Sequence, residues 1–158
     1  MKLKILFGCS QLPGALAIRG WTWSDWSHTA LLFDEPSIVD TPEIIEAVAF
    51  KGVISTGYTE FLKRYKYVAS VDIELTETQY REALALSRAQ LGKGYDWFAI
   101  AGIVFKRDWH RPDRWICSEM CPWVLESVGN PIIRTDNKLN RVVPQHLWIL
   151  NLPTTYLK

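Results

Sequence analysis

Cysteine, histidine and glutamate residues in this sequence have the types and spacing that nucleophilic catalysis requires. A cysteine nucleophile needs a histidine that takes and returns a proton, and often a third group that orients the imidazole. Cys117 is the candidate nucleophile, because the run from Trp115 to Gly129 has the pattern of a helix and Cys117 lies in its opening turn. A thiol at a helix N-terminus lies beside unpaired backbone N–H groups and the positive end of the helix dipole, and both favour the thiolate.

Pro122 bears on where this helix begins. Proline is tolerated in the first turn of a helix and is disruptive deeper in it, so we expect the helix to begin close to Cys117 or Ser118. Gly129 is a natural C-terminal stop. The alternative is that Cys117 is a small buried residue that packs the helix onto a sheet, since free cysteine is among the most buried residue types.

Three histidines could act as the base: His28, His110 and His146. His28 enters the apolar run 27–33, where a titratable side chain is costly unless it is hydrogen-bonded or used in chemistry. Its alternative role is a core histidine bonded to the backbone. His110 lies in a segment rich in Arg and Asp and is expected at the surface, and His146 follows Pro144 and is expected to be structural.

Glu46 is the polar residue inside the expected strand 43–50, between Ile45 and Ala47. In a strand it shares a face with Ile44 and Val48, because side chains alternate between the two faces. If that face looks inward, the carboxylate needs a partner, and an imidazole on the neighbouring strand would serve. The alternative is an edge strand whose glutamate reaches water.

These candidates need strands and helices to position them. Thr76 and Gln79 form a capping-box pattern, and Gly92 ends the helix that follows. Thr59 could cap a shorter helix. The apolar run 97–105 is shorter than the roughly 20 residues of a membrane span, so we expect a buried helix. We expect strands at 2–7, 27–33, 43–50, 53–56, 67–75 and within 142–152, helices at 60–65, 77–91, 97–105 and 117–129, and loops at 93–96 and 130–140. The order predicts an α+β fold with an antiparallel sheet packed against helices.

Composition limits the possible functions. The 158 residues, 48% of them hydrophobic, predict a single globular domain over residues 1–158, and we find no repeat or linker. A net charge of +1 gives no electrostatic case for nucleic acid. Three cysteines do not describe a disulfide framework, and the apolar run 3–7 is too short for a signal peptide. A reducing, cytoplasmic location is therefore the simpler expectation.

Several short motifs resemble one known family. Gly8-Cys9-Ser10, Ile18-Arg19, Thr22 and Trp26-Ser27-His28 resemble the opening of the circularly permuted papain-like amidases, relatives of the NlpC-type cell-wall peptidases. Glu46-Ala47, Gly94-Tyr95-Asp96 and Trp115-Ile116-Cys117-Ser118-Glu119 resemble the acidic, Tyr-Asp and nucleophile motifs of that family. The resemblance covers residues 8 to about 129. The chain departs from it at Cys121-Pro122-Trp123 and in the polar segment 106–114, which leaves the shape of the cleft open.

The resemblance implies a permuted papain-like fold, because His28 and Glu46 precede Cys117, the reverse of the ordinary order. It implies that Cys117 is the nucleophile, His28 the general base and acid, and Glu46 the orienting residue. Tyr95 would lie near the cleft and could donate a hydrogen bond beside the Cys117 N–H. The implied reaction is hydrolysis of an amide or ester through an acyl-enzyme, on cell-wall peptides or N-acyl and lipid-like substrates, with no cofactor.

The sequence leaves two further questions open: an alternative function for the cysteines and His28, and the role of nearby tryptophans. A metal-binding or non-catalytic module could use Cys117, Cys121 and His28, although the usual Cys-x2-Cys and His-x3-His pairs are missing. Near His28, aromatic residues either line the site or pack an ordinary loop; these are Trp21, Trp23 and Trp26.

Overall fold

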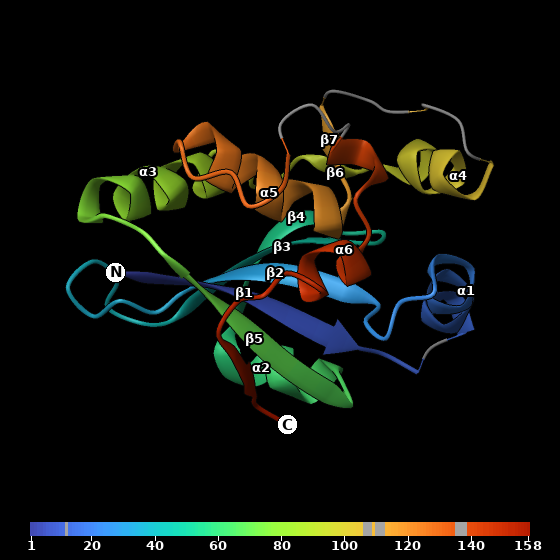
Figure 1. The fold of residues 1–158 in the computed structure, drawn as a ribbon, viewed down its shortest axis with the longest axis horizontal. Helices are drawn as coiled ribbons and strands as arrows, with labels where there is room; N and C mark the ends of the chain where they lie inside the picture. Colours follow the sequence, from blue (N-terminus) through green and yellow to red (C-terminus); the bar gives the residue numbers. More distant parts are fainter. Residues whose placement is uncertain (12, 106–108, 110–112, 135–138) are drawn as a thin grey trace.

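A six-stranded antiparallel sheet forms the centre of the structure, with the strand order β4-β3-β2-β1-β5-β8 (Figure 1). The structure is a computed structural model that describes residues 1–11, 13–105, 109, 113–134 and 139–158. The sheet strands are β1 (Lys2–Cys9), β2 (His28–Phe33), β3 (Glu43–Val48), β4 (Gly52–Gly57), β5 (Tyr67–Glu74) and β8 (Thr154–Tyr156). A small parallel pair, β6 (Gly94–Tyr95) and β7 (Arg114–Trp115), lies apart from it.

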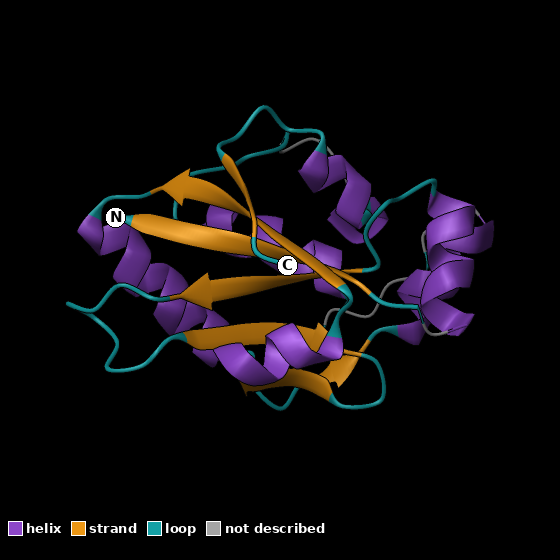
Figure 2. Ribbon diagram, turned by 90° about the horizontal axis from the view of Figure 1, so that it is seen from below, coloured by secondary structure: helices purple, strands orange, loops and turns teal. Residues whose placement is uncertain are grey.

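Helices cover both faces of this sheet. The long helices α3 and α5 lie over one face and α2 over the other, as the view from the α2 side also shows (Figures 1 and 2). Helices α1 and α4 both lie at the same end of the molecule (Figure 1). The helices are α1 (Pro13–Thr22), α2 (Tyr58–Arg64), α3 (Glu77–Arg88), α4 (Trp97–Phe105), α5 (Cys117–Ser127) and α6 (Pro144–Trp148). The predicted α+β class, with an antiparallel sheet packed against helices, is confirmed.

Alternation along the strands gives each face of the sheet its own core. Phe7, Leu31 and Ile45 belong to the larger cluster, which includes the buried side chains of α3 and α5. Their neighbours along the same strands, among them Leu32 and Ile44, belong to a smaller cluster beneath α2. Adjacent residues of a strand point to opposite faces, so the central strands are apolar on both sides.

The pairing of β2 with β3 ends just before the candidate site. Its register runs from Phe33 opposite Glu43 to Leu31 opposite Ile45. His28 and Glu46 lie beyond its last pair, and the first turn of α5 begins at Cys117. Helix α5 packs on both strands. The end of this ladder therefore lets a helix N-terminus approach the two strands that carry the histidine and the glutamate.

Most predicted elements are confirmed, including the Thr76–Gln79 capping box of α3. The predicted stop at Gly92 is wrong, because α3 ends at Arg88 with Ala89 as its C-cap, and Gly92, with a φ of 84°, lies in the turn beyond the helix. The strand predicted within residues 142–152 is wrong. That segment forms α6, whose first residue is Pro144, and a proline with fixed φ fits the first position of a helix. The last strand is β8, which pairs with β5.

Three details of the helices and loops also differ from the sequence prediction. Helix α2 begins at Tyr58 after Gly57, so Thr59 is not its cap. Helix α4 is not fully buried, since Trp97 is 42% and Phe98 51% exposed. The predicted loop at 93–96 contains β6. The segments 106–108, 110–112 and 135–138 lie outside the described residues.

Pro122 lies in the second turn of α5, although the helix does begin at Cys117 as predicted. The assumption that the proline marks the first turn was therefore wrong. An internal proline removes one backbone hydrogen bond, and the burial of nearly every side chain from Cys117 to Leu125 outweighs that loss.

Within the described residues, no helix is long and apolar enough to cross a bilayer.

Candidate active site

Cys117 is the first residue of α5, and its thiol is buried. The sulfur is hydrogen-bonded to the side chain of His28 and to the backbone N–H groups of Thr29 and Ser118. Burial by itself would raise the pKa of the Cys117 thiol. The charge and hydrogen bond of His28, with the two backbone N–H groups, outweigh burial and lower this pKa.

His28 joins the thiol to a carboxylate. Its Nε2 lies 2.7 Å from Oε2 of Glu46, so the ring nitrogen left for Cys117 is Nδ1. Burial would lower the pKa of the imidazole. The neighbouring thiolate and carboxylate, through charge and hydrogen bonds, instead raise the pKa of His28 to about 10. The two shifts favour the thiolate and imidazolium forms of the pair.

The strands explain why these two residues meet. His28 and Glu46 lie on neighbouring antiparallel strands, and the register that pairs Leu31 with Ile45 places Glu46 diagonally across from His28 on the same face. That face is the one covered by α2 and not a solvent edge. The inward orientation left open for Glu46 by the sequence is the one that the structure adopts.

Glu46 is 0% exposed and bonded at both carboxylate oxygens. Its Oε2 meets His28, and its Oε1 accepts hydrogen bonds from Thr56 Oγ1 at 2.6 Å and from Arg64 Nη1 at 2.7 Å. Burial would raise the pKa of the carboxyl. The hydrogen bond and charge of His28, with Thr56 and Arg64, lower the pKa of Glu46 to about 2. It is thus a carboxylate at any physiological pH.

An aromatic ring holds the imidazole from one side. The ring of Tyr65 stacks on that of His28 with a centroid distance of 5.4 Å and an interplanar angle of 13°. Gly8, which pairs with His28 across β1 and β2, makes this possible. A Cβ added at Gly8 would lie 2.7 Å from the Tyr65 ring. The glycine therefore gives the tyrosine room to lie against the strand beside His28.

Tyr95 reaches the same site from β6. Its side chain is buried, and the charge of Cys117 acts on it. Burial, with the negative groups nearby, raises the pKa of Tyr95 well above its usual value, so the phenol stays protonated. All four residues that the sequence singled out thus lie in one place: Cys117, His28, Glu46 and Tyr95. Sequence reasoning missed Thr56, Arg64 and Tyr65, whose segments carry no motif that marks them.

Other candidates from the sequence lie elsewhere or take structural roles. The Cys121 thiol is directed to the Cys117 carbonyl oxygen at 3.6 Å, and burial raises its pKa to about 12. His146 Nδ1 accepts the Val143 N–H at 3.3 Å, in agreement with a structural role. His110 lies outside the described residues. Trp26 packs between Phe7 and Trp148, so it is core and not cleft lining.

Glu119 lies two residues after the cysteine and is also buried. Burial, with the nearby charge of Asp96, raises the pKa of Glu119 to about 7.

Among the described residues, no group of three or more His, Cys, Asp or Glu side chains is arranged to hold a metal ion. Both ring nitrogens of His28 are occupied by Glu46 and Cys117.

This arrangement can generate a nucleophile without other help. A thiolate at a helix N-terminus is paired with an imidazolium, and the imidazolium is oriented by a buried carboxylate. This is the layout by which a cysteine attacks a carbonyl and a histidine then transfers protons.

Comparison with known proteins identifies the fold and the family of the chain. The crystal structure of metalloprotein yiiX from Escherichia coli O157:H7 is similar, with a TM-score of 0.74 over 96% of this chain and 94% of that one. Its sequence identity is 23%, so the likeness concerns the fold. No curated protein matches the chain. The model of the family described as permuted papain-like amidase enzyme, YaeF/YiiX, C92, matches residues 4–148. The chain, with its antiparallel sheet and helices in the permuted papain-like arrangement, therefore belongs to this permuted papain-like amidase family.

Proposed function

We propose that the protein is a cysteine hydrolase that cleaves an amide or ester bond through an acyl-enzyme on Cys117. One observation carries the proposal: the Cys117 thiol is bonded to His28, whose other ring nitrogen is bonded to Glu46. Membership of an amidase family supports the reaction class. The substrate is the part that the family description leaves open.

The proposed reaction has two halves. The Cys117 thiolate adds to the carbonyl carbon, and the tetrahedral intermediate expels an amine or alcohol that takes the proton from His28. Water then attacks the thioester while His28 accepts its proton, and the carboxylic acid leaves with the Cys117 sulfur restored. Glu46 keeps the imidazole oriented and stabilises its charged form in both halves.

The developing oxyanion needs hydrogen-bond donors. The backbone N–H of Cys117, at the first position of α5, is one such donor, since N–H groups at a helix start point outward along the axis. The Tyr95 hydroxyl is the second, because its raised pKa keeps the proton on the phenol. Both assignments follow the roles that the sequence resemblance implied.

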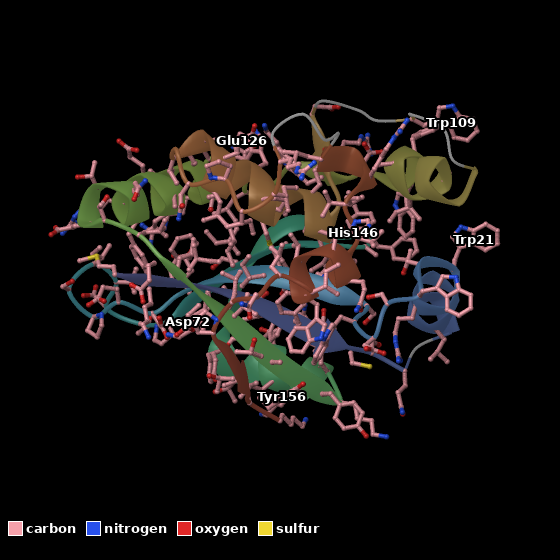
Figure 3. The ribbon with its side chains drawn as sticks, viewed as in Figure 1. Trp21, Asp72, Trp109, Glu126, His146 and Tyr156 are labelled. Carbon is pink, nitrogen blue, oxygen red and sulfur yellow. The ribbon has the colours of Figure 1, made fainter. Side chains whose placement is uncertain are left out.

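Aromatic side chains support a substrate with an apolar or planar part. The ring of Phe50, which is 90% exposed, lies 4.7 Å from that of Trp97, and Trp97 lies 5.1 Å from Tyr95, which is 9% exposed. These contacts form a continuous aromatic series from the surface to the residue beside Cys117. Trp21 and Trp109 project at the same end of the molecule, where α1 and α4 lie (Figure 3). Both an acyl chain and a sugar face suit such a surface.

Acyl-enzyme trapping tests the reaction. We expect incubation with a p-nitrophenyl ester to add the mass of the acyl group to the intact protein, and peptide mapping to find it on Cys117. Cys117→Ala should lose the adduct and the release of nitrophenol, whereas Cys121→Ala should keep both. An adduct of equal yield in Cys117→Ala would exclude Cys117 as the nucleophile.

A chain-length series tests the aromatic surface. We expect kcat/KM for p-nitrophenyl esters to rise from acetate to octanoate, and Trp97→Ala to lower it for octanoate about tenfold more than for acetate. One or two methylenes that lose an apolar contact account for roughly 1–1.5 kcal/mol. Tyr67→Ala, an exposed aromatic residue on β5, is the matched control and should lower both esters equally or not at all. The same loss for both esters in Trp97→Ala would exclude Trp97 from acyl binding.

A further inference from the structure

Arg64 completes the hydrogen bonding of the carboxylate that orients His28. It is the last residue of α2, and its Nη1 donates to Glu46 Oε1 at 2.7 Å. The next residue, Tyr65, leaves the helix with an extended backbone and stacks its ring on His28. The end of α2 therefore holds the imidazole face and the carboxylate oxygen at the same time.

The formal charges of the network cancel. The thiolate of Cys117 and the carboxylate of Glu46 are negative, and the imidazolium of His28 and the guanidinium of Arg64 are positive. Glu46 has no exposed surface, and a buried charge is costly unless it is paired and hydrogen-bonded. Without Arg64 the buried site would carry one net negative charge, which would oppose ionisation of the thiol.

The second ion pair of Arg64 is of a different kind. Its Nη2 lies 3.3 Å from Oε1 of Glu60, one helical turn earlier, and the Glu60 side chain is 67% exposed. Exposed pairs of this spacing contribute little to stability. The bond from Arg64 to Glu46 is shorter and reaches a fully buried partner. The stronger role of the guanidinium is therefore toward the active site.

We propose that Arg64 is a positioning residue of this site: by balancing and fixing Glu46, it extends to lower pH the range in which Cys117 and His28 remain a thiolate–imidazolium pair. The inference rests on the proposed function, because it concerns the reactivity of the same thiol. The other titratable side chains that act on this network are Glu60 and Tyr65 beside Arg64, Tyr95 from β6, and Cys121 from α5. Of these, both tyrosines and Cys121 have raised pKa values and stay neutral in the range concerned.

The test measures the rate of iodoacetamide alkylation of Cys117 against pH in the intact protein. The wild type should show an acid transition, where the ion pair forms, and an alkaline transition, where His28 loses its proton. In Arg64→Met we expect both transitions to move upward, by about 0.5–1 pH unit, because a nearby positive charge favours thiolate over thiol and disfavours imidazolium. Arg64→Lys keeps the charge and should return both transitions toward the wild-type positions.

Two comparisons separate this effect from general damage. Glu46→Gln removes a negative charge beside His28, so its alkaline transition should move downward, opposite to that of Arg64→Met. Arg81→Met removes an exposed arginine of α3 that pairs with Glu77, and both transitions should stay in place. The inference would be overturned if the transitions of Arg64→Met did not move, or if Arg64→Lys showed the same shift as Arg64→Met. This holds whatever the maximum alkylation rate of each variant. If wild-type Cys117 showed no acid transition at all, the proposed function itself would fail.

Discussion

At the scale of single residues, the chemistry of Cys117 depends on groups from five separate segments. The start of α5 supplies the thiol, β2 the histidine, β3 the glutamate, β4 the Thr56 hydroxyl and α2 the Arg64 guanidinium. The two negative and two positive members alternate in a chain. Removing one member therefore changes the proton affinity of those on either side.

The first residue-scale prediction concerns selectivity among the three thiols. Cys117 should react with iodoacetamide at pH 7 much faster than Cys121, because His28 lowers the pKa of Cys117 and burial raises that of Cys121 to about 12. Cys9 is buried in β1, so its alkylation should also be slow. Mass spectrometry of the folded, labelled protein measures all three. Equal labelling would count against an activated Cys117.

The second prediction concerns the base. His28→Ala removes the imidazolium that stabilises the thiolate, so alkylation of Cys117 at pH 7 should fall by at least tenfold and recover at pH 9 and above. The sign follows from the pKa of the thiol, which burial raises once its charged partner is gone. His146→Ala is the control, since that ring accepts a backbone N–H elsewhere. A wild-type pH profile in His28→Ala would mean that another group activates the thiol.

The sequence identified the residues whose chemical type is unusual for their place. A histidine and a glutamate in apolar strands, and a cysteine at a helix start, are recognisable because burial of such groups needs a reason. Arg64 and Tyr65 could not be found in this way. They follow an ordinary short helix, and their proximity to Glu46 and His28 arises only when α2 packs on the second face of the sheet.

At the scale of elements, the start of β4 supports the segment that carries Tyr95. The Val53 N–H donates to the Lys93 carbonyl at 2.8 Å, and the Gly92 N–H donates to the Val53 carbonyl at 2.9 Å. Gly52 has a φ of 78°, and a Cβ there would lie 2.2 Å from the Lys93 oxygen. The glycine therefore lets this backbone approach β6 and hold it over the site.

The element-scale prediction compares the two ends of β4. Gly52→Ala should lower the free energy of unfolding by about 1–3 kcal/mol, because a side chain there meets backbone atoms in a left-handed conformation. Esterase activity should fall as well, since the displaced Lys93 carries Tyr95 with it. Gly57→Ala is the control, because a Cβ there meets nothing within 4 Å. Urea unfolding measures both variants, and equal stability for the two would contradict the packing argument.

Local signals predicted the elements better than distant ones did. The Thr76 capping box, the apolar runs of the central strands and the helix start at Cys117 are all local, and each is confirmed. The segment 142–152, for which the sequence predicts a last short strand, forms α6 instead, because Pro144 fits the first position of a helix. The order of strands in the sheet depends on long-range pairing, for which the chain carries no short-range signal.

At the scale of the whole molecule, the ion pair of the site contributes two opposing pH effects to stability near neutral pH. The pKa of His28 is raised from 6.5 to about 10, so its contribution to the stability of the fold would, taken alone, be lost as pH rises between these values. Cys117, whose pKa is lowered from 9.0, contributes in the opposite sense. The stability that His28 would lose as pH rises is therefore offset by its partner Cys117. Glu46 adds stability above pH 4.5 that is lost as pH falls toward 2.

Glu119 is then the group that should make stability depend on pH in the neutral range. Its pKa is raised from 4.5 to about 7 by burial and by the charge of Asp96, so the folded protein holds a proton that the unfolded chain has released. This contribution is fully present below pH 4.5 and is lost as pH rises through 7. A glutamine keeps the shape of the side chain and cannot ionise.

We therefore expect Glu119→Gln to gain stability relative to the wild type as pH rises. The free energy of urea unfolding of the variant, minus that of the wild type, should be about 2 kcal/mol larger at pH 8 than at pH 5. Glu126→Gln, a half-buried glutamate of the same helix, should show the same difference from wild type at both pH values. The comparison cancels the pH effects of His28, Cys117 and Glu46, because those groups are present in every variant. If the difference between Glu119→Gln and the wild type stayed constant from pH 5 to pH 8, the folded chain would not hold that proton. The reason is that the two proteins differ only in the ionisation of the replaced carboxyl.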